Sequence, residues 1–334
     1  MNSATLVPLL GFAVGLALGA TARWTDFCMR GAIEDMLTTR EAPRLRGFAL
    51  AVVVALVGVQ ALALTGTVDL TKSLSLPKAV FWGGALVGGA MFGVGMVLTG
   101  GCGTRLLVLA ASGNLRATVT VVLFAMVAYA TLRGILAPVR GEFAALATIP
   151  FPQQSLPLVA GAAIGLAALA LALWRRGPIR HLAGGVGVGL LIPISYYITG
   201  RLGADDFNPA PTESLGVTRT AGESVVYLLT YTGAKISFGV AFVFGIPAGA
   251  ALVAALTGKF KLEGFERPAD MGRYALGALF MGFGGVCAMG CTIGNGLTGL
   301  ASLSPGALIA TPAMVLAAAA TMRWRQSRRA SVLA

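Results

Sequence analysis

The sequence predicts an all-α polytopic membrane protein with inverted-repeat architecture, about nine transmembrane helices and short re-entrant helices. Three observations support this fold class. Hydrophobic residues make up 56% of the 334 residues and charged residues only 11%, whereas a soluble protein is about 25% charged. Nine apolar runs are long enough to cross a bilayer. A motif of glycines and one cysteine occurs once in each half of the chain.

The nine apolar runs each hold close to the roughly 20 residues that a membrane-spanning helix needs. They cover residues 6–22, 48–66, 78–98, 117–136, 155–174, 182–198, 236–257, 271–290 and 307–322. With these spans, 18 of the 25 Lys and Arg residues fall on one side. Because cytoplasmic loops carry the excess of basic residues, we expect an inner-membrane protein with its N-terminus outside and its C-terminus cytoplasmic. The net charge of +12 then reflects topology, and we expect a lipid bilayer rather than nucleic acid as the partner.

The glycine motif repeats at an offset of 189 residues. The matched pairs are Gly93 and Gly282, Gly95 and Gly284, Gly101 and Gly290, and Cys102 and Cys291. This alignment predicts a first repeat over 1–150, a linker span over 151–180 and a second repeat over 181–334. Spans 1–4 then correspond to spans 6–9, and an offset of five spans inverts the second repeat. Inverted repeats are typical of transporters whose substrate site lies where the repeats meet.

Three stretches are too short to cross the membrane. Segments 103–112 and 292–302 follow the repeated cysteines, and segment 24–38 resembles them. Irregular or short elements at membrane depth are tolerated where they line a cavity or are buried in protein, so we expect short re-entrant helices here. Segment 201–223 is predicted to be a loop on the outer face.

The chemistry of the predicted spans is that of a pathway for a small anion or a neutral solute. None of the 13 acidic residues lies within a predicted span, so the usual marker of a proton or cation path is missing. The chain has one histidine, His181, and no phosphate-binding loop motif. We therefore expect no enzymatic activity, no cofactor and no metal centre.

The repeated cysteines are the candidate ligand-binding residues. Glycines beside them allow the backbone to approach a ligand closely, and a helix that starts after each cysteine would direct its N–H groups at an anion. A thiol is a weak donor with a soft sulfur, which suits a sulfur-containing ligand. The predicted thiol positions are Cys102, Cys291, Cys28 and Cys287, and the predicted anion site comprises Gly101, Gly103, Thr104, Gly290 and Thr292.

Three short motifs together resemble the YeeE/YedE family of inner-membrane proteins over essentially the whole chain. They are Gly-Gly-Cys-Gly at 100–103, Met-Gly-Cys-Thr at 289–292 and Phe-Cys-Met-Arg-Gly-Ala at 27–32. The resemblance implies uptake of thiosulfate or a related small sulfur-containing anion, passed along pore thiols by S–H hydrogen bonds. It assigns that role to Cys102 and Cys291. It also implies a soluble cytoplasmic sulfur-transfer protein as a partner.

One departure from the family pattern leaves alternatives open. The family has a third pore thiol earlier in its second half, but this chain has no cysteine between Cys102 and Cys287, and Ser237 stands near that place. Either Cys287 substitutes for that thiol, or the relay is shorter, or the substrate differs. Two other functions are separate alternatives. A membrane thiol oxidoreductase could use Cys287 and Cys291, which are four residues apart on one helix face. A soft-metal ion transporter could use Cys and Met ligands.

Overall fold

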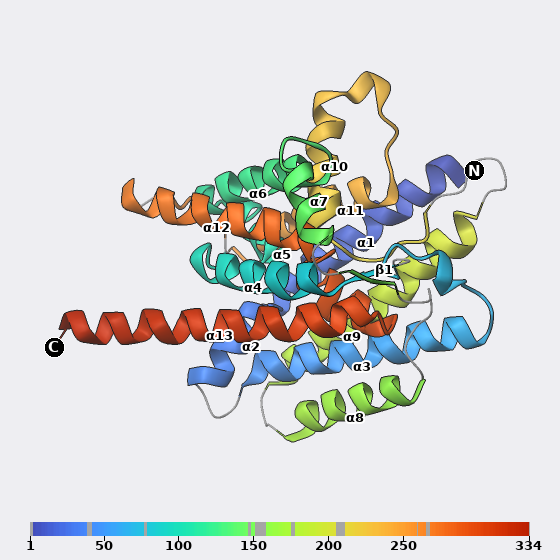
Figure 1. Cartoon of the computed structure of the whole chain (residues 1–334), viewed down its shortest axis with the longest axis horizontal. Helices are drawn as coiled ribbons and strands as arrows, with labels where there is room; N and C mark the ends of the chain where they lie inside the picture. Colours follow the sequence, from blue (N-terminus) through green and yellow to red (C-terminus); the bar gives the residue numbers. More distant parts are fainter. Residues whose placement is uncertain are drawn as a thin grey trace.

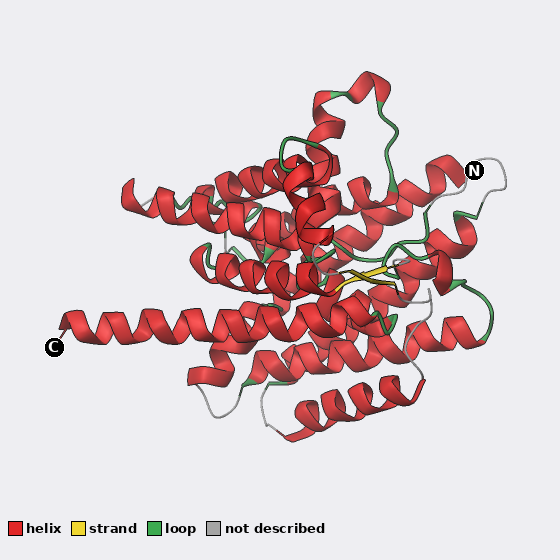
Figure 2. Ribbon diagram, viewed as in Figure 1, coloured by secondary structure: helices red, strands yellow, loops and turns green. Residues whose placement is uncertain are grey.

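The computed structural model describes residues 3–38, 42–76, 79–145, 148–150, 158–174, 178–204, 211–258, 260–264 and 268–333. Over these residues the chain is nearly all helical (Figure 2), which confirms the predicted all-α class. Most long helices run along the long axis of the molecule, and the two chain termini lie at opposite ends of it (Figure 1).

The long helices match the nine predicted spans in order. They are α1 (Ser3–Thr25), α3 (Pro43–Leu64), α4 (Trp82–Leu98), α6 (Leu115–Arg133), α8 (Leu158–Trp174), α9 (Ile179–Tyr197), α11 (Phe238–Leu256), α12 (Pro268–Cys287) and α13 (Pro305–Leu333). Among the described residues, seven stretches are long and apolar enough to cross a membrane, and they include every long helix except α8 and α12. The protein is thus a multi-pass membrane protein, while the count of nine stays a prediction. The start of the fifth predicted span, 155–157, lies outside the described residues.

Shorter elements connect or interrupt the long helices. They are α2 (Met29–Thr38), α5 (Gly103–Ala110), α7 (Ala137–Ala145), α10 (Thr218–Leu229), the 3-10 turns η1 (Leu70–Lys72) and η3 (Tyr231–Gly233), and the π-helical turns η2 (Ile198–Leu202) and η4 (Gly294–Gly299). Two three-residue strands, β1 (Ala79–Phe81) and β2 (Thr148–Pro150), pair antiparallel. Each of the three segments predicted to form a short helix contains one: α2, α5 and η4.

The prediction of a loop over 201–223 is wrong at both ends. Residues 201 and 202 end η2, and residues 218–223 form the first half of α10. Residues 205–210 lie outside the described part of the chain. The α10 sequence is rich in Thr, Gly and Ser, which are poor helix formers, but its small face packs on α6, where a Cβ on Gly222 would lie 3.1 Å from the Tyr129 amide nitrogen. Tertiary packing therefore overrides the local preference.

Glycines set the close approach of the helix pairs that form the core. A Cβ on Gly88 of α4 would lie 2.6 Å from the Gly284 carbonyl oxygen of α12, and a Cβ on Gly284 would lie 2.6 Å from the Gly88 carbonyl oxygen. Gly15 of α1 similarly abuts the α11 backbone at Phe242 and Gly245. Small residues are what allow membrane helices to pack backbone to backbone.

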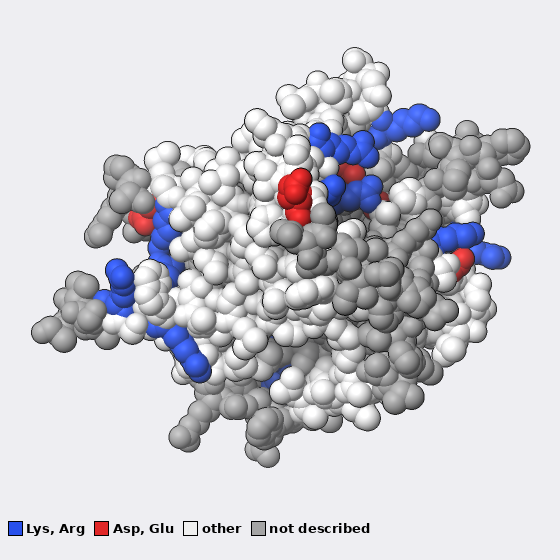
Figure 3. Space-filling model, in the orientation of Figure 1, with Lys and Arg blue, Asp and Glu red and all other residues white. Residues whose placement is uncertain are grey.

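The short helices α5 and η4 lie inside this bundle. The α5 helix packs on α6 and α11, and η4 packs on α13 and α3. Both carry their preceding cysteines into the core, because Cys102 is 3% exposed and Cys291 is 1% exposed. The charged side chains visible in Figure 3 gather near the C-terminal end and on the half that holds the N-terminus, with an uncharged band between them. This distribution suits a protein whose middle faces lipid.

Candidate functional site

Three of the four cysteines stand directly before, or close before, a short helix. The Cys291 sulfur accepts a hydrogen bond from the Gly294 N–H three residues later, at 3.4 Å. The backbone amides of Gly31 and Arg105, also three residues later, lie near the thiols of Cys28 and Cys102 in the same way. These thiols therefore lie where the unpaired amides of a helix start converge, which is a favourable place for an anion.

The structure brings Cys28 and Cys102 together. Their thiols lie close enough to interact. The hydroxyl of Thr292, the residue that directly follows Cys291 in the chain, also lies near the Cys102 thiol. The predicted thiols of the two halves thus meet in one buried row that runs from Cys28 through Cys102 to the Cys291–Thr292 turn.

The Cys291 thiol is held by backbone amides. Its sulfur accepts hydrogen bonds from the Val217 N–H at 3.5 Å and the Gly294 N–H at 3.4 Å. Val217 precedes α10 and lies 189 residues after Cys28, the same offset as between Cys102 and Cys291. A backbone amide therefore faces Cys291 where a second thiol faces Cys102.

Buried hydroxyl groups without partners surround the thiols. Thr104 in the first turn of α5, Thr218 at the start of α10 and Thr292 after Cys291 each have a buried hydroxyl oxygen without a hydrogen-bond partner of ordinary geometry. Buried polar groups are rarely left unpaired because the free-energy cost is considerable. These hydroxyls are donors available to a bound anion. Thr104 and Thr292 were predicted from the sequence, and Thr218 was not.

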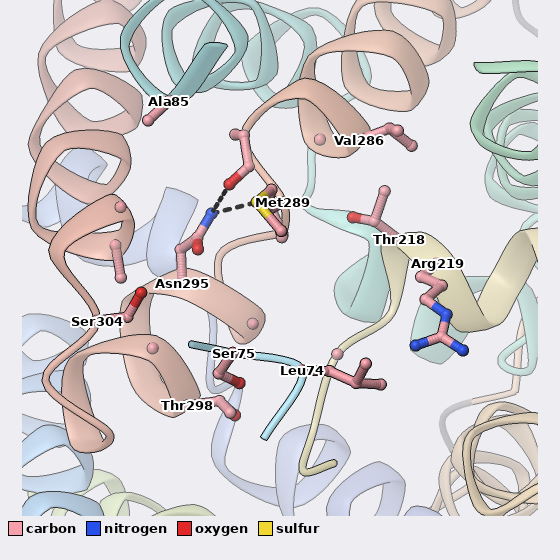
Figure 4. Close-up of a pocket in the computed structure, with 18 of the residues that line it drawn as sticks. Leu74, Ser75, Ala85, Thr218, Arg219, Val286, Met289, Asn295, Thr298 and Ser304 are labelled. Atoms are coloured by element: carbon pink, nitrogen blue, oxygen red, sulfur yellow. Dashed lines mark hydrogen bonds between the residues drawn. The ribbon is translucent and has the colours of Figure 1, made fainter. Parts of the chain in front are cut away.

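A cavity of about 240 Å³ opens beside the Cys291 turn. Its wall includes Cys287, Gly290 and Gly294 together with the charged residues Arg140 and Arg219. Figure 4 shows Thr218 and Arg219 on one side of this cavity and Asn295 and Ser304 on the other. The two arginines would attract an anion into it.

A second cavity, of about 560 Å³, is lined mainly by charged residues. Arg105 Nη1 lies 3.1 Å from Asp26 Oδ1, and Arg180 Nη2 lies 3.4 Å from Asp26 Oδ2. Asp26 is two residues before Cys28 and Arg105 is three residues after Cys102, so this cavity borders the thiol pair. The two cavities share none of the residues that line them.

The turn that presents Cys291 has an unusual backbone. Met289 adopts a left-handed conformation with φ of 57°, and Gly100, 189 residues earlier, has φ of 81°. Asn295 stabilises the second turn, because its side-chain amide donates to the Ala288 oxygen at 2.9 Å and the Gly290 oxygen at 3.1 Å (Figure 4). Thr99 has the matching role in the first turn, where its hydroxyl donates to the Gly95 or Gly101 oxygen, each at 3.0 Å.

The other predicted residues lie on the wall of the first cavity or at the starts of helices. Cys287, the last residue of α12, lines the first cavity. Gly103 opens α5 in a place where a Cβ would lie 3.2 Å from the Phe124 ring. Ser237 caps the start of α11, where its hydroxyl accepts from the Val240 N–H at 3.2 Å.

One sequence signal near the site was missed. Arg30 and Glu34 form an ion pair on α2 at 3.4 Å, and Arg219 and Glu223 form one on α10 at 2.7 Å. Both residues recur at the same 189-residue offset as the cysteines. This match would have predicted α10 as the counterpart of α2, and with it the position of Thr218.

Comparison with known proteins gives a family and two relatives. The family model described as sulphur transport matches residues 24–175 and 170–320. The chain is 27% identical over 328 residues to the thiosulfate transporter TsuA of Escherichia coli (strain K12), with 86% of each chain covered. It is 27% identical over 345 residues to the thiosulfate transporter TsuA of Spirochaeta thermophila, with 96% of this chain and 99% of the relative covered.

Proposed function

The chain belongs to the sulphur transport family, and on this premise we propose that it takes up thiosulfate or a closely related small sulfur-containing anion. Its relatives are named as transporters rather than enzymes, and transport of a sulfur compound follows from the family. The identity of the anion and its route are the proposal. The anion passes along the row of thiols, each of which donates S–H to it and hands it to the next.

The contact between Cys28 and Cys102 carries this proposal. Two free, buried thiols of one half lie side by side and reach the Cys291–Thr292 turn of the other half. Thiols are weak donors, so each holds a sulfur anion loosely enough to release it. Movement between sites requires such weak, repeated binding.

The groups around the thiols support an anion rather than a cation. Backbone amides point at Cys28, Cys102 and Cys291, and the orphan hydroxyls of Thr104 and Thr292 add further donors. The anion site predicted from Gly101, Gly103 and Gly290 fits this arrangement, because residues without side chains leave the amides uncovered.

We propose that spans 1–4 and 6–9 form an inverted repeat around this row, with halves over 1–150 and 181–334. Helix packing supports it. Under the alignment α1 corresponds to α9, α3 to α11, α4 to α12 and α6 to α13. Exchanging counterparts converts the α1–α11 pair into α9–α3, converts α4–α13 into α12–α6, and leaves α4–α12 unchanged, and all of these pairs are in contact.

The predicted topology fixes which side of the membrane each cavity faces. With the N-terminus outside, the first cavity faces the periplasm and the charged second cavity faces the cytoplasm of an inner-membrane protein. Moving an anion inward is opposed by about 2.3 kcal/mol per charge per 100 mV. Consumption by a soluble cytoplasmic sulfur-transfer protein at the second cavity would draw the anion through.

The test is growth of a strain that cannot assimilate sulfate, with thiosulfate as the sole sulfur source. The wild-type gene should restore growth, and Cys28→Ala, Cys102→Ala and Cys291→Ala should each abolish or strongly reduce it at normal membrane levels. Cys287→Ala is the matched control, since Cys287 lines the cavity outside the thiol row and its loss should reduce growth much less.

Other outcomes would exclude part of this proposal or favour an alternative function. Growth with all three variants would keep the substrate and exclude the thiol relay. No growth with well-expressed wild type would exclude thiosulfate. A disulfide between Cys287 and Cys291 that forms and breaks during turnover would favour the thiol oxidoreductase, and growth rescue by copper or nickel would favour the soft-metal transporter.

A further inference from the structure

Glu213 is a buried carboxyl on the wall of the first cavity. It is 8% exposed and lines the same space as Cys287, Gly290 and Gly294. It lies between η2 and α10, outside the membrane-spanning helices. Its backbone is fixed, because the Thr199 hydroxyl donates to the Glu213 carbonyl oxygen at 2.7 Å. Nothing in the proposed relay of thiols uses this carboxyl.

The charge of Glu213 is only partly compensated. On α10, Arg219 Nη1 lies 4.0 Å from Glu213 Oε2, whereas Arg219 Nε lies 2.7 Å from Glu223 Oε1. Arg219 therefore forms its closer ion pair with Glu223. From α11 the Gly239 amide donates to the Glu213 carboxylate, and from α7 Arg140 lines the cavity.

These contacts favour the protonated form of Glu213. Burial raises the pKa of the carboxyl from its ordinary 4.5 to about 7, with Glu223 acting in the same direction and Arg219 and the Gly239 amide against it. The free-energy cost of burying the charged carboxylate exceeds the stabilisation that one distant guanidinium and one amide provide. The carboxyl therefore changes its charge near neutral pH, in the cavity that an incoming anion enters.

We propose that Glu213 is a proton-binding site linked to anion binding in the first cavity, so that a sulfur-containing dianion binds there together with one proton. An anion in the cavity repels the carboxylate and favours its protonation. Once protonated, Glu213 no longer repels the anion, and the positive charges of Arg219 and Arg140 on the cavity wall attract it. Linkage is reciprocal, so the proton strengthens anion binding as much as the anion strengthens proton binding. This inference rests on the proposed function for its ligand.

The experiment measures radiolabelled thiosulfate binding to the purified full-length protein between pH 6 and pH 9. Thiosulfate stays a dianion over this range, so any pH dependence belongs to the protein. For the wild type we expect Kd to rise as pH increases, approaching about tenfold per pH unit above the midpoint. Addition of thiosulfate in weak buffer at neutral pH should remove protons from solution.

Two variants make the test specific. Glu213→Gln mimics the protonated carboxyl, so its Kd should stay close to the wild-type value at pH 6 and change little up to pH 9. Asp69→Asn removes a carboxyl with an exposed side chain and should keep the wild-type pH profile.

A wild-type Kd that does not change with pH, or a Glu213→Gln variant that keeps the wild-type slope, would overturn the inference while leaving thiosulfate transport intact. If the wild type binds no thiosulfate at any pH, the proposed substrate fails as well. Binding of sulfate, measured in parallel, then shows whether the cavity holds another dianion with the same proton linkage.

Discussion

At the residue scale, the protein places unfavourable groups where its site is formed. Glu213 is a buried acid, Met289 has a left-handed backbone, and Thr104, Thr218 and Thr292 hold buried hydroxyls without partners. Each raises the free energy of the folded state locally and persists because the surrounding packing holds it in place. Such features gather at functional sites, and here all of them lie beside the thiol row or the first cavity.

The raised pKa of Glu213 gives a pH dependence of stability that needs no ligand. A carboxyl whose pKa rises from 4.5 to about 7 on folding binds its proton more tightly in the folded state. The folded state is therefore destabilised progressively as pH rises from about 4.5 to about 7, by roughly 3 kcal/mol at most. We expect Glu213→Gln to unfold at a higher temperature than the wild type at pH 8 and at nearly the same temperature at pH 5. Thermal unfolding in detergent at both pH values checks this, and an equal shift at both would contradict it.

The left-handed backbone at Met289 and at Gly100 predicts opposite effects of two substitutions on stability. Met289 has φ of 57° and an exposed side chain, so Met289→Gly should stabilise the protein by about 1 kcal/mol. Gly100 has φ of 81° and open space where a Cβ would lie, so Gly100→Ala should cost about 1 kcal/mol through backbone conformation alone. Denaturation of both variants in one detergent measures the difference. Shifts of the same sign would refute the equivalence of the two turns.

At the element scale, close helix packing and short helix starts form the site together. The contact between α4 and α12 brings backbones within reach of each other at Gly88 and Gly284, and these helices lead directly into the turns that hold Cys102 and Cys291. The positions of the two cysteines therefore depend on the depth to which α4 and α12 interlock. A helix start then directs amides at each sulfur.

This dependence predicts a contrast between two glycines of α12. Gly284→Ala would place a Cβ 2.6 Å from the Gly88 oxygen, and such overpacking should cost about 1–3 kcal/mol and lower uptake. Gly272→Ala has no atom within 4 Å of the new Cβ and should be neutral or slightly stabilising, because alanine favours helix. The fraction of monodisperse protein after heating compares the two. A Gly284→Ala variant as stable as Gly272→Ala would exclude close packing as the constraint.

At the scale of the whole molecule, the proposed route runs between two cavities, and the predicted topology decides which of them faces outside. The two charged ends visible in Figure 3 and the opposite positions of the termini in Figure 1 suit an odd number of crossings. The excess of basic residues on one side predicts the orientation of the protein in the membrane.

Cysteine labelling tests that direction. Lys72 in η1 and Lys261 between α11 and α12 are both exposed and are predicted to lie on opposite sides. A membrane-impermeant maleimide should label Lys72→Cys in intact cells and Lys261→Cys only after the inner membrane is permeabilised. The reverse pattern would invert the proposed topology and exchange the roles of the two cavities.

The sequence by itself determined the membrane fold, the order of the long helices, the short helices after Cys102 and Cys291, and the family. Composition and apolar run length decide these because the bilayer fixes how long and how apolar a span must be. Only the tertiary structure decided that Cys28 lies beside Cys102, that Thr218 and Glu213 line the first cavity, and that Ser237 caps the start of α11. These depend on which helix faces meet, and glycines far apart in the sequence set those contacts. α10 forms for the same reason: its small residues favour helix only when packed on α6.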